Sequence, residues 1–315
     1  MVERNTAIKI AYWYYTDGMT QEEIAKKLGW SRQRVNKAVN SLIDDGVVSI
    51  VINGLDNDNI RLEHKIEHEF SLKQVIIADS GQSEASMLSE LGKRAAQFLD
   101  GYIQNGKTIG VSWGLTLGET IRWMQPVSKR NCSVVQLVGG VNTAVESAKP
   151  DEVTRQLAHK LNCDYSILYA PAIMDSEAAR EILAQQDMSK KSFERMGSCD
   201  IALVGIGQLD ESATIVSLGF LLRSDLYDML GQGYIGDVCF NHYKADGDTG
   251  SFILANRVMG VDIETLKKIP VVIGIAGGEI KAQSTFGALN TGCIDILITD
   301  TTLASKLEEY IDKTR

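Results

Sequence analysis

The amino-acid sequence predicts an α/β protein. A small N-terminal helix-turn-helix unit with a candidate wing precedes a large, doubly wound domain with a mostly parallel sheet. Two observations predict this fold class: short helical segments separated by glycine turns fill the first 46 residues, and short β-branched runs then alternate with amphipathic segments. The length of 315 residues suits one small and one large domain. We expect the small unit at 1–52, a linker at 53–58 and the large domain at 59–315.

The first predicted helix covers residues 3–15. Apolar side chains recur on one stripe at Ile8, Ala11, Tyr12 and Tyr15. The helix should end at Asp17-Gly18, because glycine readily adopts the left-handed conformation that terminates helices.

The second and third predicted helices carry clear start and stop signals. Thr20 and Glu23 have the spacing of a capping box, and Gly29 should end the second helix. Ser31 can cap the third helix, predicted over 31–43. The apolar positions of the third helix repeat at helical spacing at Val35, Ala38, Val39 and Leu42. Three short helices with a tight glycine turn are typical of a helix-turn-helix.

The segment after the third helix is predicted to contain a strand and a linker. Val47 to Ile52 is typical of a strand and is the candidate wing, and residues 53–59 are rich in turn formers. Helical periodicity resumes with Ile60, Glu63, Ile66 and Phe70 on one side of a further helix.

The polar face of the third helix predicts DNA binding. Between Ser31 and Ile43 the sequence holds three basic residues and no acidic residue, which suits a polyanion. Arg, Gln and Asn side chains can also contact guanine or adenine edges in a major groove. The alternative is a helical hairpin with a solvated basic face. The residues expected to contact DNA are Thr20, Gln21, Ser31, Arg32, Gln33, Arg34, Asn36 and Lys37.

The net charge of -9 is unevenly distributed and does not argue against DNA. Residues 1–50 hold 7 Lys/Arg against 6 Asp/Glu, a balance of +1, so residues 51–315 hold the remaining 25 against 35, a balance of -10. DNA phosphates contact only the docking face of a protein, so the net charge of the N-terminal unit bears on DNA binding and that of the whole chain does not. The sequence shows no signal-peptide pattern and no apolar run long enough to span a bilayer, so we expect a cytoplasmic protein without a membrane partner.

Six apolar runs predict the strands of the large domain. They are QVIIAD (74–79), KTIGVS (107–112), CSVVQLV (132–138), DIALVGIG (200–207), PVVIGIAGG (270–278) and IDILITD (294–300). Several of them end in glycine or another small residue. In an open α/β sheet, ligands bind beyond the carboxyl ends of the strands, where glycines let backbone amides approach and helix N-termini favour anions. We therefore expect a shared crevice for a small molecule, although a glycine cluster taken alone is usually just a turn.

Gly110-Val111-Ser112-Trp113-Gly114 has the spacing of a hydrolase nucleophile elbow. Of the four histidines, only His159 and His242 follow Ser112, and only one convincing strand precedes the motif in this domain. We therefore interpret Ser112, together with Thr116, as a hydrogen-bond donor to a phosphate or a sugar hydroxyl.

No cofactor and no metal ion are expected. The five cysteines lie 31 to 54 residues apart without a C-x-x-C pair, and reduced, buried thiols are the simplest interpretation. Asp237, His242 and Asp246 supply oxygen and nitrogen ligands in principle, but their spacing matches no metal signature.

The N-terminal unit together with GVSWGLTL (110–117), VGIGQ (204–208), IGDVCFNHYKADG (235–247) and GIAGGEIKAQSTFGALNTGCIDILITD (274–300) resembles the SorC family of bacterial sugar-responsive transcriptional regulators. The resemblance covers almost the whole chain. It implies an effector domain related to sugar-phosphate isomerases and deaminases, a homotetramer, and control of a sugar-utilisation operon, with sorbose as the first candidate sugar.

The resemblance and the glycine-ended runs together define the expected effector site. Its residues are Ser112, Trp113, Gly114, Leu115, Thr116, Gly139, Gly140, Gly205, Gly207, Gly236, Asp237, Gly277, Gly278 and Lys281. Two positions depart from the family pattern: Leu115 and Val138 stand where relatives often carry polar or basic residues. A pocket without those groups should bind fewer phosphates, so a bisphosphate or a Schiff-base effector is not expected.

A sugar-phosphate isomerase or deaminase is the alternative function. In those enzymes a catalytic histidine closely follows a glycine-x-glycine strand end, whereas here Gly205-Ile206-Gly207 is followed by no histidine until His242. The sequence therefore predicts a regulator and not an enzyme, with operator DNA, a sugar or sugar phosphate, and further copies of the same chain as its partners.

Overall fold

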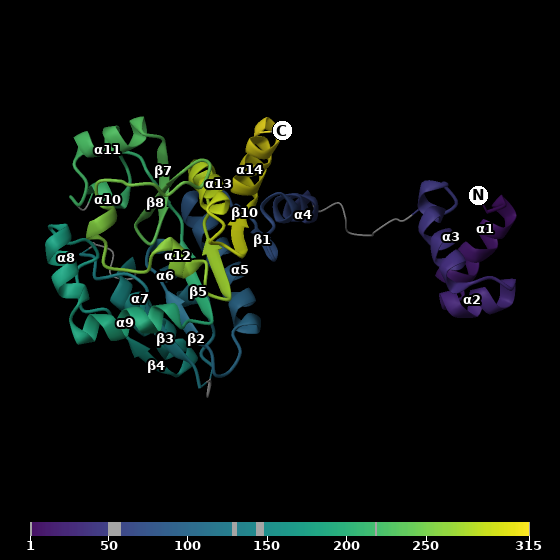
Figure 1. Ribbon diagram of the computed structural model, residues 1–315, viewed down its shortest axis with the longest axis horizontal. Coiled ribbons are helices and arrows are strands. Elements are labelled where there is room, and N and C mark those ends of the chain that lie inside the picture. The colour runs from purple at the N-terminus through teal and green to yellow at the C-terminus, as the bar shows by residue number, and fades with distance from the viewer. Residues whose placement is uncertain (1, 50–57, 128–130, 143–147, 218, 315) are drawn as a thin grey trace. The chain divides into compact units, whose positions relative to one another are not determined.

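The computed structural model describes residues 2–49, 58–127, 131–142, 148–217 and 219–314. The chain divides into two compact units, Met1–Asn57 and Asp58–Arg315 (Figure 1). Most of the expected linker at 53–58 lies outside the described residues, and Asp58 is the first residue of a helix. No helix within the described ranges combines the length and apolar character needed to cross a membrane.

The N-terminal unit is built from helices. Its elements are α1 (Arg4–Ala11), the π-helical turn η1 (Tyr12–Thr16), α2 (Gln21–Leu28) and α3 (Arg32–Asp44). The first helix therefore ends near the expected place, but its last turn is π-helical. The expected apolar stripe was wrong, since Ile8, Tyr12 and Tyr15 are 49%, 56% and 48% exposed. Ala7 and Ile10 are buried instead, because the side of α1 that carries them packs in the core with α3.

The caps predicted for α2 and α3 are confirmed. The Glu23 backbone amide donates to Thr20 Oγ1 at 3.3 Å, and the Thr20 amide donates to Glu23 Oε2 at 2.8 Å. Gly29 ends α2 with a φ of 66°, in the left-handed region. Ser31 Oγ accepts from the amide of Arg34 at the start of α3. The buried residues of α3 are those predicted: Val35, Ala38, Val39 and Leu42.

The strand expected at 47–52 is absent from its described part. The amides of Val47 and Val48 both donate to the carbonyl of Leu42, at 2.9 and 3.0 Å. These bonds fold residues 47–49 back onto the end of α3 and use amides that a strand ladder would need. Residues 50–52 lie outside the described ranges.

The larger unit contains two sheets in its described part. A seven-stranded, wholly parallel sheet has the order β1-β10-β9-β5-β2-β3-β4, and a three-stranded antiparallel sheet has the order β6-β7-β8. The strands are β1 (Gln74–Ala78), β2 (Thr108–Val111), β3 (Ser133–Gln136), β4 (Asp164–Ser166), β5 (Ile201–Gly205), β6 (Gly207–Gln208), β7 (Tyr234–Val238), β8 (Asn241–Lys244), β9 (Val271–Ile275) and β10 (Ile296–Asp300). All six predicted strands are confirmed, as is the doubly wound fold class.

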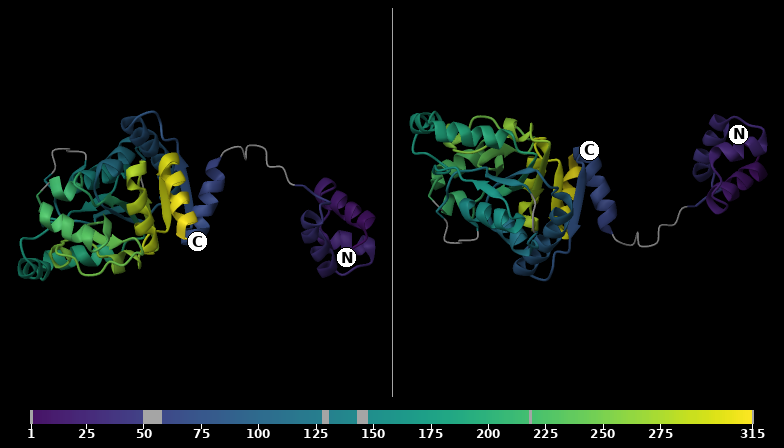
Figure 2. Two further views of the ribbon diagram at one scale, coloured as in Figure 1. Left: turned by 90° about the horizontal axis from the view of Figure 1, so that it is seen from above. Right: turned by 90° about the horizontal axis from the view of Figure 1, so that it is seen from below.

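Helices cover both faces of the parallel sheet (Figure 2). The helices in the described part of this unit are α4 (Asp58–Phe70), α5 (Glu84–Tyr102), α6 (Leu115–Trp123), α7 (Pro150–Leu161), α8 (Glu177–Ala184), α9 (Asp187–Gly197), α10 (Thr214–Ser217), α11 (Arg223–Gly231), α12 (Ile263–Leu266), α13 (Ala282–Asn290) and α14 (Thr301–Thr314), with 3-10 turns η3 (Ala255–Arg257) and η4 (Glu279–Lys281). Side chains alternate along each strand, so Ile76 and Ile298 join α5, α6 and α7 in one core, whereas Val75 and Leu297 join α13 and α14 in the other.

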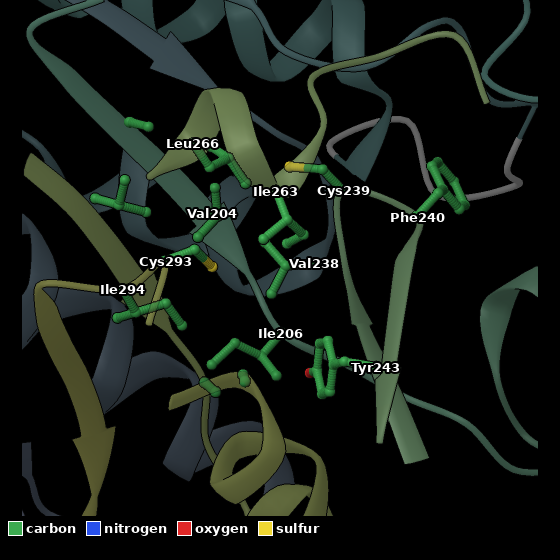
Figure 3. Close-up of a cluster of buried hydrophobic side chains, with 14 of the residues drawn as sticks. Val204, Ile206, Val238, Cys239, Phe240, Tyr243, Ile263, Leu266, Cys293 and Ile294 are labelled. Carbon is green, nitrogen blue, oxygen red and sulfur yellow. The ribbon is translucent and has the colours of Figure 1, made fainter. Parts of the chain in front are cut away.

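The small antiparallel sheet packs on the α13 side of the main sheet. Figure 3 shows Val238 and Tyr243 from β7 and β8 among the same buried side chains as Val204, Ile206 and Ile263. This packing holds β7 beside the carboxyl end of β5, where β6 pairs with it directly.

Helix α4 covers the edge strand β1. Its buried residues are Leu62 and Ile66, whereas Ile60, which was expected on the inner side, is 49% exposed. The amides of Val75 and Ile77 donate to the carboxylates of Glu67 and Glu63, at 2.8 and 2.9 Å. Burial raises the pKa of Glu63. Two side chains of α4 thus satisfy alternate backbone amides of the sheet edge.

Helix α4 is also paired with α14, which lies beside it (Figure 2). Lys65 Nζ lies 2.8 Å from both Glu308 Oε1 and Asp312 Oδ1, and Arg61 contacts Glu308 at 3.0 Å. Lys65 and Glu308 are partly buried, whereas their partners Arg61 and Asp312 are exposed, so the cluster orients α4 against α14 and adds little stability at its exposed end.

Candidate functional site

The order of the strands places a crevice in the larger unit. From β2 the chain proceeds outward through β3 to β4 and then returns to β5 on the other side of β2. The strand order therefore reverses between β2 and β5, and a doubly wound sheet binds its ligand beyond the carboxyl ends at this point. A cavity of about 750 Å³ lies there.

Five strand ends of the parallel sheet contribute to the cavity lining. The described lining residues are Ser80, Gly81, Ser83, Glu84, Met87, Leu88, Ser112, Trp113, Gly114, Leu115, Thr116, Gly205, Ile206, Gly207, Gln208, Ser212, Ala213, Ile215, Asp237, Cys239, Phe240, Gly277, Gly278, Ile280, Lys281 and Thr302. Eleven of the fourteen expected effector residues belong to this set. They come from the ends of β2, β5 and β9 and from β7.

Gly139, Gly140 and Gly236 are absent from the described lining. The amides of Gly139 and Gly140 donate to backbone carbonyls, and a Cβ on Gly139 would lie 2.5 Å from the carbonyl oxygen of Pro171. A Cβ on Gly236 would lie 2.5 Å from the Cβ of Ser284. These three glycines were expected at the ligand. The structure places Gly139 and Gly236 instead where chain segments pack closely, and Gly140 at an exposed position whose amide bonds to Ala170.

The turn after β2 presents a helix N-terminus to the cavity. Gly114 has a φ of 116°, which other residues rarely adopt, and it precedes the first residue of α6, Leu115. The Gly114 amide donates to the carbonyl of Ala148. The next amides, in the first turn of α6, have no partner within the helix and can donate to a ligand. Ser112 is buried in the same wall.

Two aromatic rings form an apolar wall. The rings of Trp113 and Phe240 stack with centroids 5.2 Å apart and planes 21° apart. Phe240 lies in a two-residue turn between β7 and β8, in which Cys239 and Phe240 both have positive φ. Such backbone is unfavourable for residues other than glycine, so the surrounding contacts must hold it. Burial raises the pKa of the Cys239 thiol to about 12, which keeps it protonated beside Ser112.

Asp237 is held in a fixed position by the turn and by β6. Its Oδ2 accepts from the amide of Phe240 at 2.9 Å. It pairs across the small sheet with Gly207, and a Cβ on Gly207 would lie 2.0 Å from Asp237 Oδ1. Glycine at 207 is therefore what makes room for this carboxylate in the cavity wall.

Lys281 brings a cation to the lining. It ends the 3-10 turn η4, which follows the glycines after β9. Burial lowers the pKa of Lys281, and the nearby carboxylates of Asp237 and Glu84 oppose this shift. Within the described ranges its ammonium has no hydrogen bond and no ion pair.

Asp300 organises the loops around the cavity, and the sequence reasoning missed it. This buried residue ends β10, and its carboxylate accepts from Gly278 N at 2.6 Å, Ser80 Oγ at 2.7 Å and Thr302 N at 2.9 Å. It thus ties together the loops after β1, β9 and β10. An aspartate directly after an apolar strand and before Thr301-Thr302 is the signal that could have identified it. Glu84 and Gln208 were also missed.

The cavity does not assemble a serine hydrolase site from its described residues. His242 is buried outside the lining, its Nδ1 lies 3.2 Å from the carbonyl oxygen of Phe240, and burial lowers its pKa. His159 lies on α7, which packs against the opposite face of the sheet. No group of three or more potential metal ligands occurs in the described part of the chain, Asp237, His242 and Asp246 included.

The predicted DNA-reading face lies on the exposed side of α3. Arg32, Gln33 and Lys37 are exposed. The guanidinium of Arg34 lies 3.9 Å from the centre of the Trp30 ring. The remaining members are bound within the unit: Gln21 Nε2 donates to Asn36 Oδ1 at 3.2 Å, and the hydroxyls of Thr20 and Ser31 cap α2 and α3.

Comparison with known proteins supports both units. Residues 57–307 match the family described as "Putative sugar-binding domain", and residues 15–49 match the family described as "Winged helix-turn-helix DNA-binding". The chain is 29% identical over 305 residues to the "Sorbitol operon regulator" of Klebsiella pneumoniae, which covers 95% of this chain and 96% of that protein. It is 27% identical to "Transcriptional regulator LsrR" of Klebsiella pneumoniae subsp. pneumoniae, with 96% and 93% covered. It is 26% identical to "Erythritol catabolism regulatory protein EryD" of Brucella abortus, with 96% and 95% covered.

The fold agrees with that of a solved relative. The crystal structure of the full-length sorbitol operon regulator SorC from Klebsiella pneumoniae superposes with a TM-score of 0.75 at 28% identity, covering 98% of this chain and 99% of that chain. The three relatives are named as an operon regulator, a transcriptional regulator and a catabolism regulatory protein, and each matches more than nine-tenths of this chain. The chain belongs to the SorC family of sugar-responsive bacterial transcriptional regulators.

Proposed function

We propose that this protein is a DNA-binding transcriptional regulator of a sugar-utilisation operon, controlled by a sugar or sugar phosphate in the cavity of the larger unit. The observation that carries the proposal is the cavity at the β2/β5 reversal, whose wall combines Lys281, Asp237 and the N-terminus of α6. Hydroxyl-rich ligands need such a mixture of donors and acceptors. Binding rather than turnover is proposed because the described lining contains no histidine for acid-base catalysis.

Sorbose and sorbitol are the first effectors to test. Sorbose follows from the resemblance noted in the sequence, and sorbitol from the name of a relative that matches nearly the whole chain. Regulators that read operator DNA with a helix-turn-helix commonly present two recognition helices to two half-sites, so we propose a homo-oligomer, a tetramer by analogy with the family. Such a protein acts in the cytoplasm, where the operator is.

The effector site can be tested with the full-length chain. Thermal-shift screening against sugars and their phosphates should identify a ligand that raises the melting temperature, because a ligand that binds only the folded state stabilises it. Isothermal titration should then show that Asp237→Ala and Lys281→Ala each lose about 1.5–3 kcal/mol of binding, as expected for a hydrogen bond to a charged group. Operator binding without effector should persist in a gel-shift assay. Wild-type affinity in both variants would remove these residues from the site.

The DNA-reading face can be tested separately. Gln33→Ala should cost about 1–3 kcal/mol and relax sequence preference, since a lost base contact removes discrimination. Lys37→Ala should weaken all sequences alike and reduce the salt dependence. Lys9→Ala, which changes an exposed lysine on α1 of the same unit, is the matched control. Unchanged operator binding by both α3 variants would place the reading face elsewhere.

A further inference from the structure

A hydrogen bond joins two members of the predicted DNA-reading face across α2 and α3. Gln21 is the first residue of α2, and its Nε2 donates to Oδ1 of Asn36, a residue of α3, at 3.2 Å. The hydroxyls of Thr20 and Ser31 accept from amides within their own helical turns, whereas this bond links one helix to the other. It therefore sets the orientation of a side chain of α3 from outside that helix.

The backbone on each side of the bond is held in place. Gln21 directly follows Thr20, which is locked to Glu23 by the capping box. Asn36 directly follows Val35, which is fully buried in the core where α2 packs on α3. The fold of the helix pair therefore brings the two side chains within reach of each other.

The bond determines which polar atom of Asn36 is left for DNA. An asparagine amide has one accepting oxygen and one donating nitrogen. Since Oδ1 is directed to Gln21, Nδ2 lies on the other side of the amide, and no group in the described ranges accepts from it. Asn36 is exposed and shares the exposed side of α3 with Gln33, three residues earlier. Asn36 therefore offers a hydrogen-bond donor beside another predicted reading residue.

The base edges in a major groove discriminate between these two atoms. Guanine presents only acceptors there, N7 and O6, whereas cytosine presents only its N4 donor. An outward Nδ2 therefore favours guanine over cytosine at the contacted base, and an outward Oδ1 would favour cytosine. Adenine offers both kinds of group and so does not separate the two orientations.

We propose that Gln21 is a positioning residue for operator recognition, which holds the Asn36 amide with Nδ2 toward the base edges and so disfavours cytosine at the base that Asn36 contacts. The inference rests on the proposed function and deepens it, because it assigns the specificity at one base pair to a residue of α2. Without Gln21 the amide can turn over and accept from cytosine N4. The loss should appear as relaxed preference at one base pair, since the other contacts of α3 are unchanged.

The contacted base pair is found first, with the full-length chain. Selection from a pool of random duplexes identifies the preferred operator sequence, and fluorescence anisotropy measures the affinity for each single-base-pair variant of it. The base pair at which Asn36→Ala loses its preference is the contact of Asn36. Gln33→Ala, which removes a glutamine from the same face, is the matched control and should lose preference at a different base pair. Unchanged preference of Asn36→Ala at every base pair would overturn the inference.

Gln21→Ala should then act through Asn36 alone. It should reduce the preference for guanine over cytosine at that base pair about fivefold or more and leave the other base pairs as in the wild type. In the Asn36→Ala background the same change should have no further effect on the preference, because both changes act through one amide. A uniform loss of affinity at all base pairs would show a merely structural role and overturn the inference, as would an unchanged preference.

Gln21→Glu should reverse the orientation of the Asn36 amide. A carboxylate can only accept, so the variant should take a hydrogen bond from Asn36 Nδ2 and leave Oδ1 to face the DNA. The ratio of affinities for guanine and cytosine at the contacted base should move toward cytosine. The added negative charge weakens binding to all sequences alike and cancels in this ratio. A wild-type ratio in Gln21→Glu would overturn the inference while leaving the proposed function in place, and failure of the wild-type protein to select any sequence from the pool would refute both.

Discussion

Gly207→Ala should disable the effector site while leaving the fold intact. The added methyl would lie 2.0 Å from Asp237 Oδ1, more than about 1 Å inside ordinary van der Waals contact. The atom it meets is the end of a side chain, so the carboxylate can rotate away without moving the backbone. In doing so it gives up the hydrogen bond from the amide of Phe240 and leaves its place in the cavity wall.

The expected loss of effector affinity follows from the hydrogen bond that the Asp237 carboxylate is proposed to accept from the effector. A hydrogen bond to a charged group contributes about 1.5–3 kcal/mol, which corresponds to a fall in affinity of about 10- to 150-fold. Isothermal titration with the best ligand from the screen measures this, and circular dichroism with thermal unfolding checks the fold. Operator binding without effector should be unchanged, because the DNA-reading helix belongs to the other unit.

A double-mutant cycle separates this mechanism from general damage. Asp237→Asn weakens binding by removing the charge, and adding Gly207→Ala to it should cost little more, since both changes act through the same group. Full additivity of the two losses would show that the methyl acts elsewhere. Wild-type affinity of Gly207→Ala would refute the claim that Asp237 contacts the effector.

Three further predictions concern stability. Thr20→Ala should destabilise the N-terminal unit by about 1 kcal/mol through loss of the capping box, measured by thermal unfolding, and an unchanged melting temperature for that unit would contradict it. Gly139→Ala should lower the stability of the larger unit, because the new methyl meets the backbone of Pro171, yet should leave effector affinity unchanged, which titration at a temperature below unfolding would check. Burial lowers the pKa of His242, so in mild acid the unfolded chain binds a proton that the folded chain does not bind. The free energy of unfolding should therefore have its full value above pH about 6.5 and decline below it. His242→Gln should flatten this decline in denaturant titrations.

The strands and caps of this protein were predictable because their signals are local. Each of the six predicted strands is a β-branched run that is buried on both faces, and each cap is set by residues three positions apart. Strand β4 gave no such signal, since Asp164 and Tyr165 at the sheet edge are exposed. The first helix offered apolar residues on more than one side, and only packing against α3 decides which side is buried.

The site was predictable as far as strand ends determine it. Parallel strands bring their carboxyl ends to one edge, so the glycines after β2, β5 and β9 could be grouped from the sequence. Gly139 and Gly236 could not be told apart from them, because close approach of a backbone and close approach of a ligand both require glycine. Glu84 and Asp300 act through partners on other elements, and that pairing exists only in the folded chain. Gln208 bonds locally to Asp210 and Ser212, but its place in the lining depends on the packing of β6 beside β7.

The cover that α4 provides for β1 determines where this protein can be shortened. Removing the chain up to Phe70 deletes no strand, but it would uncover the amides of Val75 and Ile77, which now donate to Glu67 and Glu63. An uncovered strand edge pairs readily with another chain and is a common origin of aggregation. A soluble fragment of the larger unit must therefore keep the whole of α4, even though that helix stands next to the linker.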